Sequence, residues 1–312
     1  VLYERPLKGN DMQPRHESVP ARAAAAALFA WVLAGAAPAQ ALTAAGSTIE
    51  FLGPDSHVMY VECRTGHAGA SRGETIVFVH GASHTGVVYT ATPDQRPGWA
   101  PWFAAQGYRS CVVDLPGHGR APPVADFPRM SNAQTAPAML ELIDRHGPVI
   151  LVGHSMGARV IQETLAAADA RQRAAVRAAV LLAPVGPAEL LRTPLEGFPL
   201  PESAPFRFPA ELEFQLFAMA GDVPAPQFPQ QAYAQYQRSL VPESPRSLNE
   251  IVVPDLASKH GPGLFDGIQT LVVAAEGDNA TPPARVAAAA EFWGVELALL
   301  EADWGLQGNG HL

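Results

Sequence analysis

The chain has 312 residues, of which 48% are hydrophobic and 16% charged, and its formal net charge at pH 7 is −9. This length is enough for one large α/β domain with an insertion, or for two domains, and the hydrophobic fraction can fill a sizeable core. The negative charge argues against a nucleic-acid partner, because nothing in it would neutralise phosphates. Two cysteines, Cys63 and Cys111, exclude a disulfide-rich scaffold and a metal site built from cysteines.

The first 41 residues are typical of an upstream extension followed by an export signal. Arg15 and Arg22 precede 15 small or apolar residues over 23–37, and Ala39–Ala41 offers a small-x-small cleavage pattern. A bilayer span needs about 20 apolar residues, so this run is too short to be one. The alternatives are an alanine-rich helix of the mature protein and a membrane anchor. We expect a secreted or periplasmic protein with no stable membrane span.

Beyond the leader, strand patterns alternate with helix patterns. The expected strands cover residues 48–52, 57–63, 75–79, 108–113, 149–152, 179–182, 270–274 and 295–300. The expected helices cover residues 99–106, 131–145, 158–168 and 283–293. This alternation predicts an α/β fold with a mostly parallel sheet and helices on both faces.

Residues 186–266 break the alternation and are rich in proline and phenylalanine. We interpret them as a cap inserted over the carboxyl ends of the strands, the edge where open α/β sheets bind ligands. The alternative is a surface subdomain whose aromatic residues fill only its own small core. The α/β domain that carries this insertion is therefore predicted to comprise residues 42–185 and 267–312.

Residues 153–157 read Gly-His-Ser-Met-Gly between an expected strand and an expected helix. This context is typical of a nucleophile elbow, a tight turn that lifts the hydroxyl of Ser155 into an open site. Side chains larger than hydrogen at the two glycines would collide with neighbouring backbone. The bare pattern is weak, and the alternative is an ordinary strand-to-helix turn that contains a serine.

A serine hydroxyl becomes a good nucleophile when a histidine, oriented by a carboxylate, removes its proton. Asp278 follows the expected strand 270–274; Glu276 is its local competitor, and a capping role in the turn is its alternative. His311 is the only histidine after Asp278, in a glycine-rich loop, and its alternative is a disordered tail residue. We therefore predict the catalytic residues Ser155, Asp278 and His311.

An oxyanion hole needs two aimed N–H donors. We expect them from the backbone of Met156 and from that of Ala82, with Ser83 as a substitute for Ala82. Structural roles are expected for His80, His84, His118 and His154, and contact with substrate is the alternative for His84, which sits closer to the expected oxyanion loop. The sequence contains no metal-ligand set, phosphate loop or dinucleotide fingerprint, so we expect no metal and no cofactor.

The elbow, the Asp278 turn, Gly310-His311, the His80-Gly81 loop and the run Asp-Leu-Pro-Gly-His-Gly at 114–119 resemble the α/β-hydrolase superfamily, in particular secreted bacterial esterases and lipases. The resemblance spans residues 48–312 and implies a mixed eight-stranded sheet and no cofactor. It implies a serine hydrolase that cleaves small-molecule carboxylic esters through an acyl-enzyme. The phenylalanine-rich cap suggests an apolar acyl group. The alternatives are hydrolysis of lactones, amides or carbon–carbon bonds with the same triad, and a non-catalytic binding protein on this fold.

The resemblance also bears on the cysteines and on the last residues. It makes the strand that carries Cys63 an antiparallel neighbour of the one that carries Cys111, so a disulfide is possible if the register brings them close. Two separate buried thiols are the alternative. Family members usually continue past the histidine into a final helix, so we expect a fragment or a truncation after Leu312.

Overall fold

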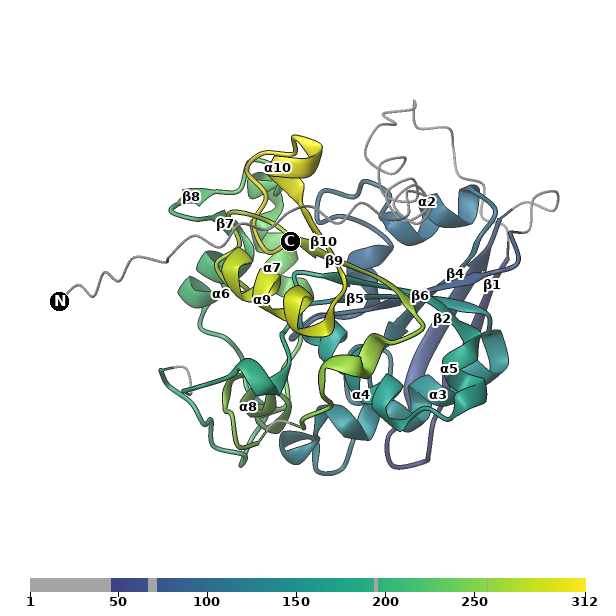
Figure 1. Ribbon diagram of the computed structural model, residues 1–312. Coiled ribbons are helices and arrows are strands. Elements are labelled where there is room, and N and C mark those ends of the chain that lie inside the picture. Colours follow the sequence, from purple (N-terminus) through teal and green to yellow (C-terminus); the bar gives the residue numbers. More distant parts are fainter. Residues whose placement is uncertain (1–45, 67–71, 194–195, 257) are drawn as a thin grey trace, which may run out of the picture. The chain divides into compact units, whose positions relative to one another are not determined.

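The computed structural model describes residues 46–66, 72–193, 196–256 and 258–312 (Figure 1). The predicted export signal and its cleavage pattern lie outside these residues. Eight strands form one sheet in the order β1-β2-β4-β3-β5-β6-β9-β10. Their bounds are β1 Ser47–Leu52, β2 Met59–Thr65, β3 Thr75–Val79, β4 Arg109–Asp114, β5 Val149–His154, β6 Val176–Leu182, β9 Gln269–Ala274 and β10 Glu296–Leu299.

Strand β2 is antiparallel to both of its neighbours, β1 and β4, and every other pair in the sheet is parallel. The predicted mixed, mostly parallel, eight-stranded sheet is therefore confirmed. All five residues of β3 and the first five of β5 are buried, which explains their uninterrupted apolar sequences. Strands in the middle of a parallel sheet read this way because helices cover both faces.

Helices cover the sheet on both sides (Figure 1). Helix α2, Trp99–Ala105, packs on β4 and β2, whereas α3, Ala136–His146, and α4, Met156–Ala167, pack together on the opposite face. Helix α9, Pro283–Trp293, packs on β9 and β10. These four helices were predicted with small differences at their ends. The short helix α5, Ala170–Ala175, was not predicted, although Asp169 and Gln172 form a capping box at its start.

The end of the last strand differs from the prediction. A strand was expected over 295–300, but Leu300 already begins helix α10, Leu300–Trp304. Acidic side chains cap the start of this helix. The Asp303 carboxylate accepts the Leu299 amide at 2.7 Å, and the Glu276 carboxylate accepts the amides of Glu301 and Ala302. These acceptors replace the partners that a longer strand would have offered.

Residues 186–266 contain no strand of the main sheet among those described. Their principal elements are α6 Ala210–Phe217, α7 Tyr233–Ser239, α8 Pro245–Val252 and a hairpin of β7 Met219–Ala220 and β8 Val223–Pro224. Phe217, Phe228 and Tyr236 belong to a small core within the insertion, whereas Leu248 and Phe265 belong to the main core. The insertion thus has a core of its own, and its last part is packed into the body of the protein.

Cys63 and Cys111 are joined by a disulfide bond. The register pairs these residues directly across the antiparallel strands β2 and β4, so the condition set by the resemblance is met. Both residues are buried in the main core. Separately, none of the helices described is long and apolar enough to cross a membrane.

Candidate active site

Ser155 occupies a tight turn between β5 and α4, with a φ of 53° and a ψ of −117°. A positive φ is uncommon for a residue with a side chain, and such strain persists only where the surroundings impose it. A Cβ at Gly153 would lie 2.6 Å from Cδ1 of Ile161. A Cβ at Gly157 would overlap the carbonyl oxygens of Val79 and His80. Both flanking glycines are therefore required by close packing.

Asp278 and His311 are brought together although 33 positions separate them. Nδ1 of His311 lies 2.8 Å from Oδ2 of Asp278, and both side chains are almost completely buried. Because a carboxylate oxygen accepts only, Nδ1 of His311 is the donor. Asp278 also accepts the amides of Ala280 and Thr281 and the hydroxyl of Thr281, each at 2.8 Å. The orientation of the carboxylate is thus fixed. Asp278 also accepts hydrogen bonds within its turn, which is the capping role named above as its alternative.

His311 is held beside the serine turn by His154, the residue that precedes Ser155. Nε2 of His154 donates to the carbonyl oxygen of His311 at 2.7 Å, and the two imidazole rings lie 4.5 Å apart. Nε2 of His311 is buried and has no hydrogen-bond partner among the described residues. The structure therefore joins Asp278 to His311 but does not close a hydrogen bond from His311 to Ser155. Such bonds are often open in the absence of substrate.

The insertion contributes an aromatic side chain to this site. The ring of Phe217, at the end of α6, stacks on the His311 ring with centroids 5.7 Å apart. Phe217 also meets the His84 ring edge-on at 5.4 Å. The alternative that the aromatic residues of the insertion fill only its own core does not hold for Phe217, because this side chain contacts His311. Nothing in the sequence singled out this phenylalanine from its neighbours.

The loop after β3 carries Ala82, the expected second oxyanion donor. Ala82 is 8% exposed, and a Cβ on the preceding Gly81 would lie 3.1 Å from Cβ of Ser155, so the loop passes beside the serine. The amide of Ser83 donates to Oε2 of Glu243 at 2.9 Å. That amide is engaged and is therefore not free to replace Ala82. Met156, the other expected donor, is the first residue of α4, where amides have no partner within the helix.

The four other histidines at this edge are hydrogen-bonded; His80, His84 and His118 are buried, and His154 is half-buried. His80 donates from Nδ1 to the carbonyl of Gly81 and accepts the Leu115 amide at Nε2. Burial first, then the charge of His118, lowers the pKa of His80 to about 4. Burial likewise lowers the pKa of His84 to about 4 and that of His154 well below its usual value. These three imidazoles are neutral at pH 7.

His118 differs from these three, because Nε2 contacts both carboxylate oxygens of Glu243 at 3.0 and 3.1 Å. Burial opposes charge on both groups, but their attraction outweighs it, so the pKa of His118 is raised and that of Glu243 is lowered. Sequence reasoning gave His118 a local structural role and missed Glu243. The signal for Glu243 in the sequence was weak, because it is one glutamate within a long insertion.

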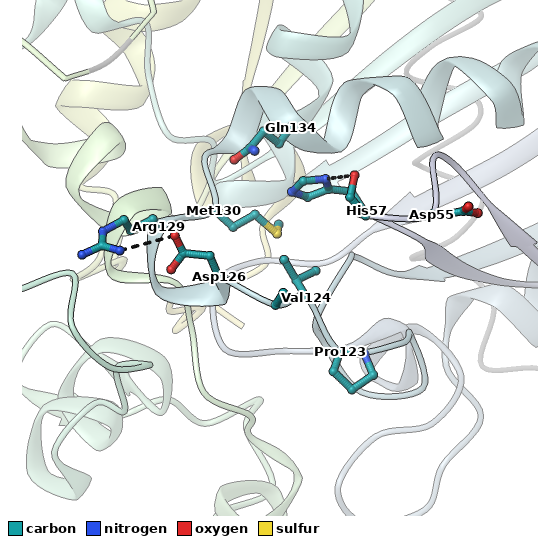
Figure 2. Close-up of a pocket in the computed structure, with 10 residues that line it drawn as sticks. Asp55, His57, Pro123, Val124, Asp126, Arg129, Met130 and Gln134 are labelled. Atoms are coloured by element: carbon teal, nitrogen blue, oxygen red, sulfur yellow. Dashed lines mark hydrogen bonds and ion pairs between the residues drawn. The ribbon is translucent and has the colours of Figure 1, made fainter.

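Two other features do not belong to this site. A pocket of about 340 Å³ lies between the turn after β1 and the loop before α3, lined by His57, Asp126, Arg129 and their neighbours (Figure 2). None of the predicted catalytic residues lines it. Among the described residues, Glu50, Cys63 and His146 come close enough to share a metal ion, but the Cys63 sulfur is committed to its disulfide.

The fold and the serine turn define a protein of the α/β-hydrolase class. Residues 76–312 match the alpha/beta hydrolase family, and the chain belongs to this family. Its fold is similar to that of an esterase from Exiguobacterium antarcticum, with a TM-score of 0.58, 17% identity and coverage of 85% of this chain and 92% of that one. At this identity the likeness shows the fold alone.

Two curated relatives match shorter stretches of the chain. A pimeloyl-[acyl-carrier protein] methyl ester esterase from Methylococcus capsulatus is 35% identical over 94 residues, which are 30% of this chain and 32% of that protein. A probable secreted lipase, phiG, from a fungal species is 45% identical over 47 residues, which are 15% of this chain and 13% of the lipase. The matched stretches span a third or less of the length of these relatives.

Proposed function

We propose that this hydrolase cleaves carboxylic esters of small molecules through an acyl-enzyme formed on Ser155. Nε2 of His311 removes the hydroxyl proton as the serine oxygen attacks the ester carbonyl. The amides of Met156 and Ala82 then hold the oxyanion, and the alcohol leaves with the proton from His311. Water repeats the sequence on the acyl-enzyme and releases the acid. Asp278 keeps the imidazole in the tautomer with a free Nε2 and stabilises its cation.

The observation that carries this proposal is the buried Nε2 of His311, which has no hydrogen-bond partner in the part of the chain that the structure describes. Its Nδ1 is fixed by Asp278 at 2.8 Å and its carbonyl by His154, the residue before Ser155. A buried imidazole nitrogen without a partner has a desolvation cost that a purely structural histidine would avoid. The names of the relatives point to esters as the substrate class, and apolar lining by Phe217 favours an apolar substituent.

The test is ester hydrolysis by Ser155→Ala measured beside the unchanged protein. We expect turnover of p-nitrophenyl esters to fall by at least about 10³-fold, because the nucleophile is lost. Ser56→Ala is the matched control, since Ser56 lines only the pocket of Figure 2 and should leave turnover unchanged. Retained turnover in Ser155→Ala would refute the assignment. A panel of acyl lengths, lactones and anilides tests the bond type, and labelling by a fluorophosphonate distinguishes an enzyme from a binding protein.

We also propose that the protein is exported. The alanine-rich leader and the Cys63–Cys111 disulfide support an oxidising compartment. Expression of the chain with its first 41 residues in a bacterial host tests this. The protein recovered outside the cytoplasm should begin near Leu42, and recovery of uncleaved protein from the cytoplasm alone would contradict export.

A further inference from the structure

The loop that carries Ala82 is held in a strained shape. Ser83 has a φ of 61°, in the left-handed region that residues with side chains rarely adopt. The carbonyl of Gly81 accepts Nδ1–H of His80 and the amide of His84. Because C=O and N–H of a trans peptide point in opposite directions, the amide of Ala82 faces away from these donors. The direction of this amide thus depends on what fixes the loop.

Residues 236–243 of the insertion fix the next peptide groups of the loop. The Glu243 carboxylate accepts the Ser83 amide at 2.9 Å, and the Val241 amide donates to the Ser83 carbonyl at 2.9 Å. Both polar groups of the strained residue are therefore bound by the insertion. Conformations of this kind persist only where surrounding contacts determine them more than once.

A third contact reaches the loop through His84. Its Nδ1 lies 2.6 Å from the Ala82 carbonyl oxygen, which only accepts, so Nδ1 carries the proton. Nε2 is then the acceptor, and the Tyr236 hydroxyl donates to it at 2.8 Å. The peptide between Ala82 and Ser83 is bound at its carbonyl by His84 and at its amide by Glu243. All three contacts start from the short segment 236–243.

Glu243 is itself held rigidly. It is fully buried, it accepts the Ser244 amide at 2.8 Å, and its backbone exchanges two hydrogen bonds with Phe206. Nδ1 of His118 faces the carbonyl of Pro116 and Nε2 faces the Glu243 carboxylate. Both of these partners only accept, so both nitrogens carry protons and His118 is an imidazolium. The bond from Ser83 therefore ends on a charged acceptor, which makes it stronger than a neutral one.

We propose that Glu243, assisted by Tyr236, is a positioning residue for the oxyanion-binding loop, and that it acts by holding Ser83 so that the Ala82 amide stays aimed at the serine site. This inference rests on the proposed esterase function. The insertion then has a part in catalysis beyond covering the site. Glu243 touches no reacting atom, and its effect appears where the tetrahedral intermediate is stabilised.

The test compares Glu243→Gln, Tyr236→Phe and the unchanged protein with p-nitrophenyl ester substrates. The glutamine cannot supply two acceptor oxygens to Ser83 and Ser244 or pair with charged His118. We expect kcat to fall about 10- to 100-fold with KM within about threefold, as for small misplacements of transition-state groups. Inhibition by phenylboronic acid, which forms a tetrahedral adduct on serine, should weaken by a similar factor. Amide exchange of the peptide covering 81–84 should become faster.

Glu250→Gln is the matched control. Glu250 is also a buried carboxylate of the insertion that accepts a backbone amide, but its partners are Asn132 and Arg246, neither of which belongs to the oxyanion loop. It should change kcat by less than about threefold, since no transition-state contact is affected. A Glu243→Gln variant that matches Glu250→Gln in kcat and in boronate inhibition overturns the inference.

Tyr236→Phe removes one hydroxyl, so it keeps the inference testable if Glu243→Gln does not fold. Its kcat should fall about 3- to 10-fold with unchanged KM, because only an indirect support of Ala82 is lost. A wild-type kcat in this variant overturns the inference. If the unchanged protein lacks Ser155-dependent turnover, the proposed function and this inference fail together. If turnover depends on Ser155 but not on Glu243 or Tyr236, only the inference fails.

Discussion

His154 donates a hydrogen bond of 2.7 Å from Nε2 to the carbonyl oxygen of His311, joining the residue before the serine turn to the last loop of the chain. Its Nδ1 carries no proton, because desolvation of this half-buried imidazole lowers its pKa well below the usual value. The hydrogen bond from His154 therefore fixes the backbone of His311. It leaves Nε2 of His311 without a hydrogen-bond partner among the described residues. The geometry of the site depends on this contact as well as on Asp278.

His154→Phe keeps an aromatic ring against His311 but removes the N–H donor. We expect kcat to fall about tenfold with little change in KM, because the base becomes less well positioned for proton transfer. The rate of fluorophosphonate labelling of Ser155 should fall by a similar factor. An unchanged labelling rate would show that the His311 loop does not need this bond.

Asp278→Asn should lower kcat by about 10³- to 10⁴-fold, since an amide no longer fixes the tautomer of His311 or stabilises its cation. Glu276→Gln provides the comparison, because Glu276 caps helix α10 through the amides of Glu301 and Ala302. It should leave kcat within about threefold. Steady-state kinetics of both variants decide between these neighbouring carboxylates, and a larger loss in Glu276→Gln would reverse their roles.

Gly157→Ala tests the packing of the serine turn. The added methyl group would overlap the carbonyl oxygens of Val79 and His80, so we expect the free energy of unfolding to fall by about 1–3 kcal/mol. Gly186→Ala is the control, because its new Cβ would find an ordinary contact at 3.5 Å with Ala289. Urea denaturation of both variants measures the difference. Equal stabilities would mean that the turn adjusts without cost.

The His118–Glu243 pair predicts a dependence of stability on pH. Burial disfavours the charged form of both groups, but the attraction between them is stronger. The pKa of His118 is therefore raised above its usual 6.5, and that of Glu243 is lowered below its usual 4.5. Asp114, His80 and His84 are the other titratable groups near this pair. The contribution of the pair is complete between about pH 4.5 and 6.5. This contribution is lost as the pH rises through the raised pKa of His118, and also as the pH falls through the lowered pKa of Glu243.

Unfolding of wild type and Glu243→Gln by urea at about pH 5.5 and about pH 9 measures this. Their difference in unfolding free energy should be about 3–5 kcal/mol at the lower pH, the cost of leaving one buried partner unpaired. At the higher pH the difference should shrink, because His118 loses its proton. A difference that is independent of pH would contradict a charged pair.

The Cys63–Cys111 disulfide closes a loop with a sequence separation of 48 residues. Chain entropy alone gives a stabilisation of about 4 kcal/mol for such a loop. Replacing both cysteines with alanine should lower the free energy of unfolding by up to this amount. Alkylation after denaturation should add no label without reductant and two with it, as measured by intact mass. Labelling without reductant would contradict the bond.

The sheet was predictable because its strands are short apolar runs, and residues typical of turns mark their ends, as Gly53-Pro54 and His80-Gly81 do. The serine turn was predictable because tight geometry demands glycine at fixed positions, as the contacts of Gly153 and Gly157 explain. Asp278 was predictable from its place after an expected strand and His311 from its place after Asp278, and their contact at 2.8 Å agrees with both. Their catalytic roles stay predictions.

Glu243, Phe217 and Tyr236 could not be found in this way. They lie in an insertion of short helices and loops, and their partners are more than 90 residues away along the chain. No local pattern encodes a contact between a loop at residue 83 and an acid at residue 243. Helix α10 was missed for a related reason, since Glu276 caps it from a distant turn.

The contacts of the Ser83 loop also set an order for assembly during synthesis. A ribosome releases residues 75–84 long before residues 236–243, so strand β3 can join its neighbours while the loop above it still lacks its partners. Long-range contacts of this kind form late, because the intervening chain must first be closed into a loop. A nascent chain therefore holds most of its sheet before it holds the contacts that fix the loop around Ser83.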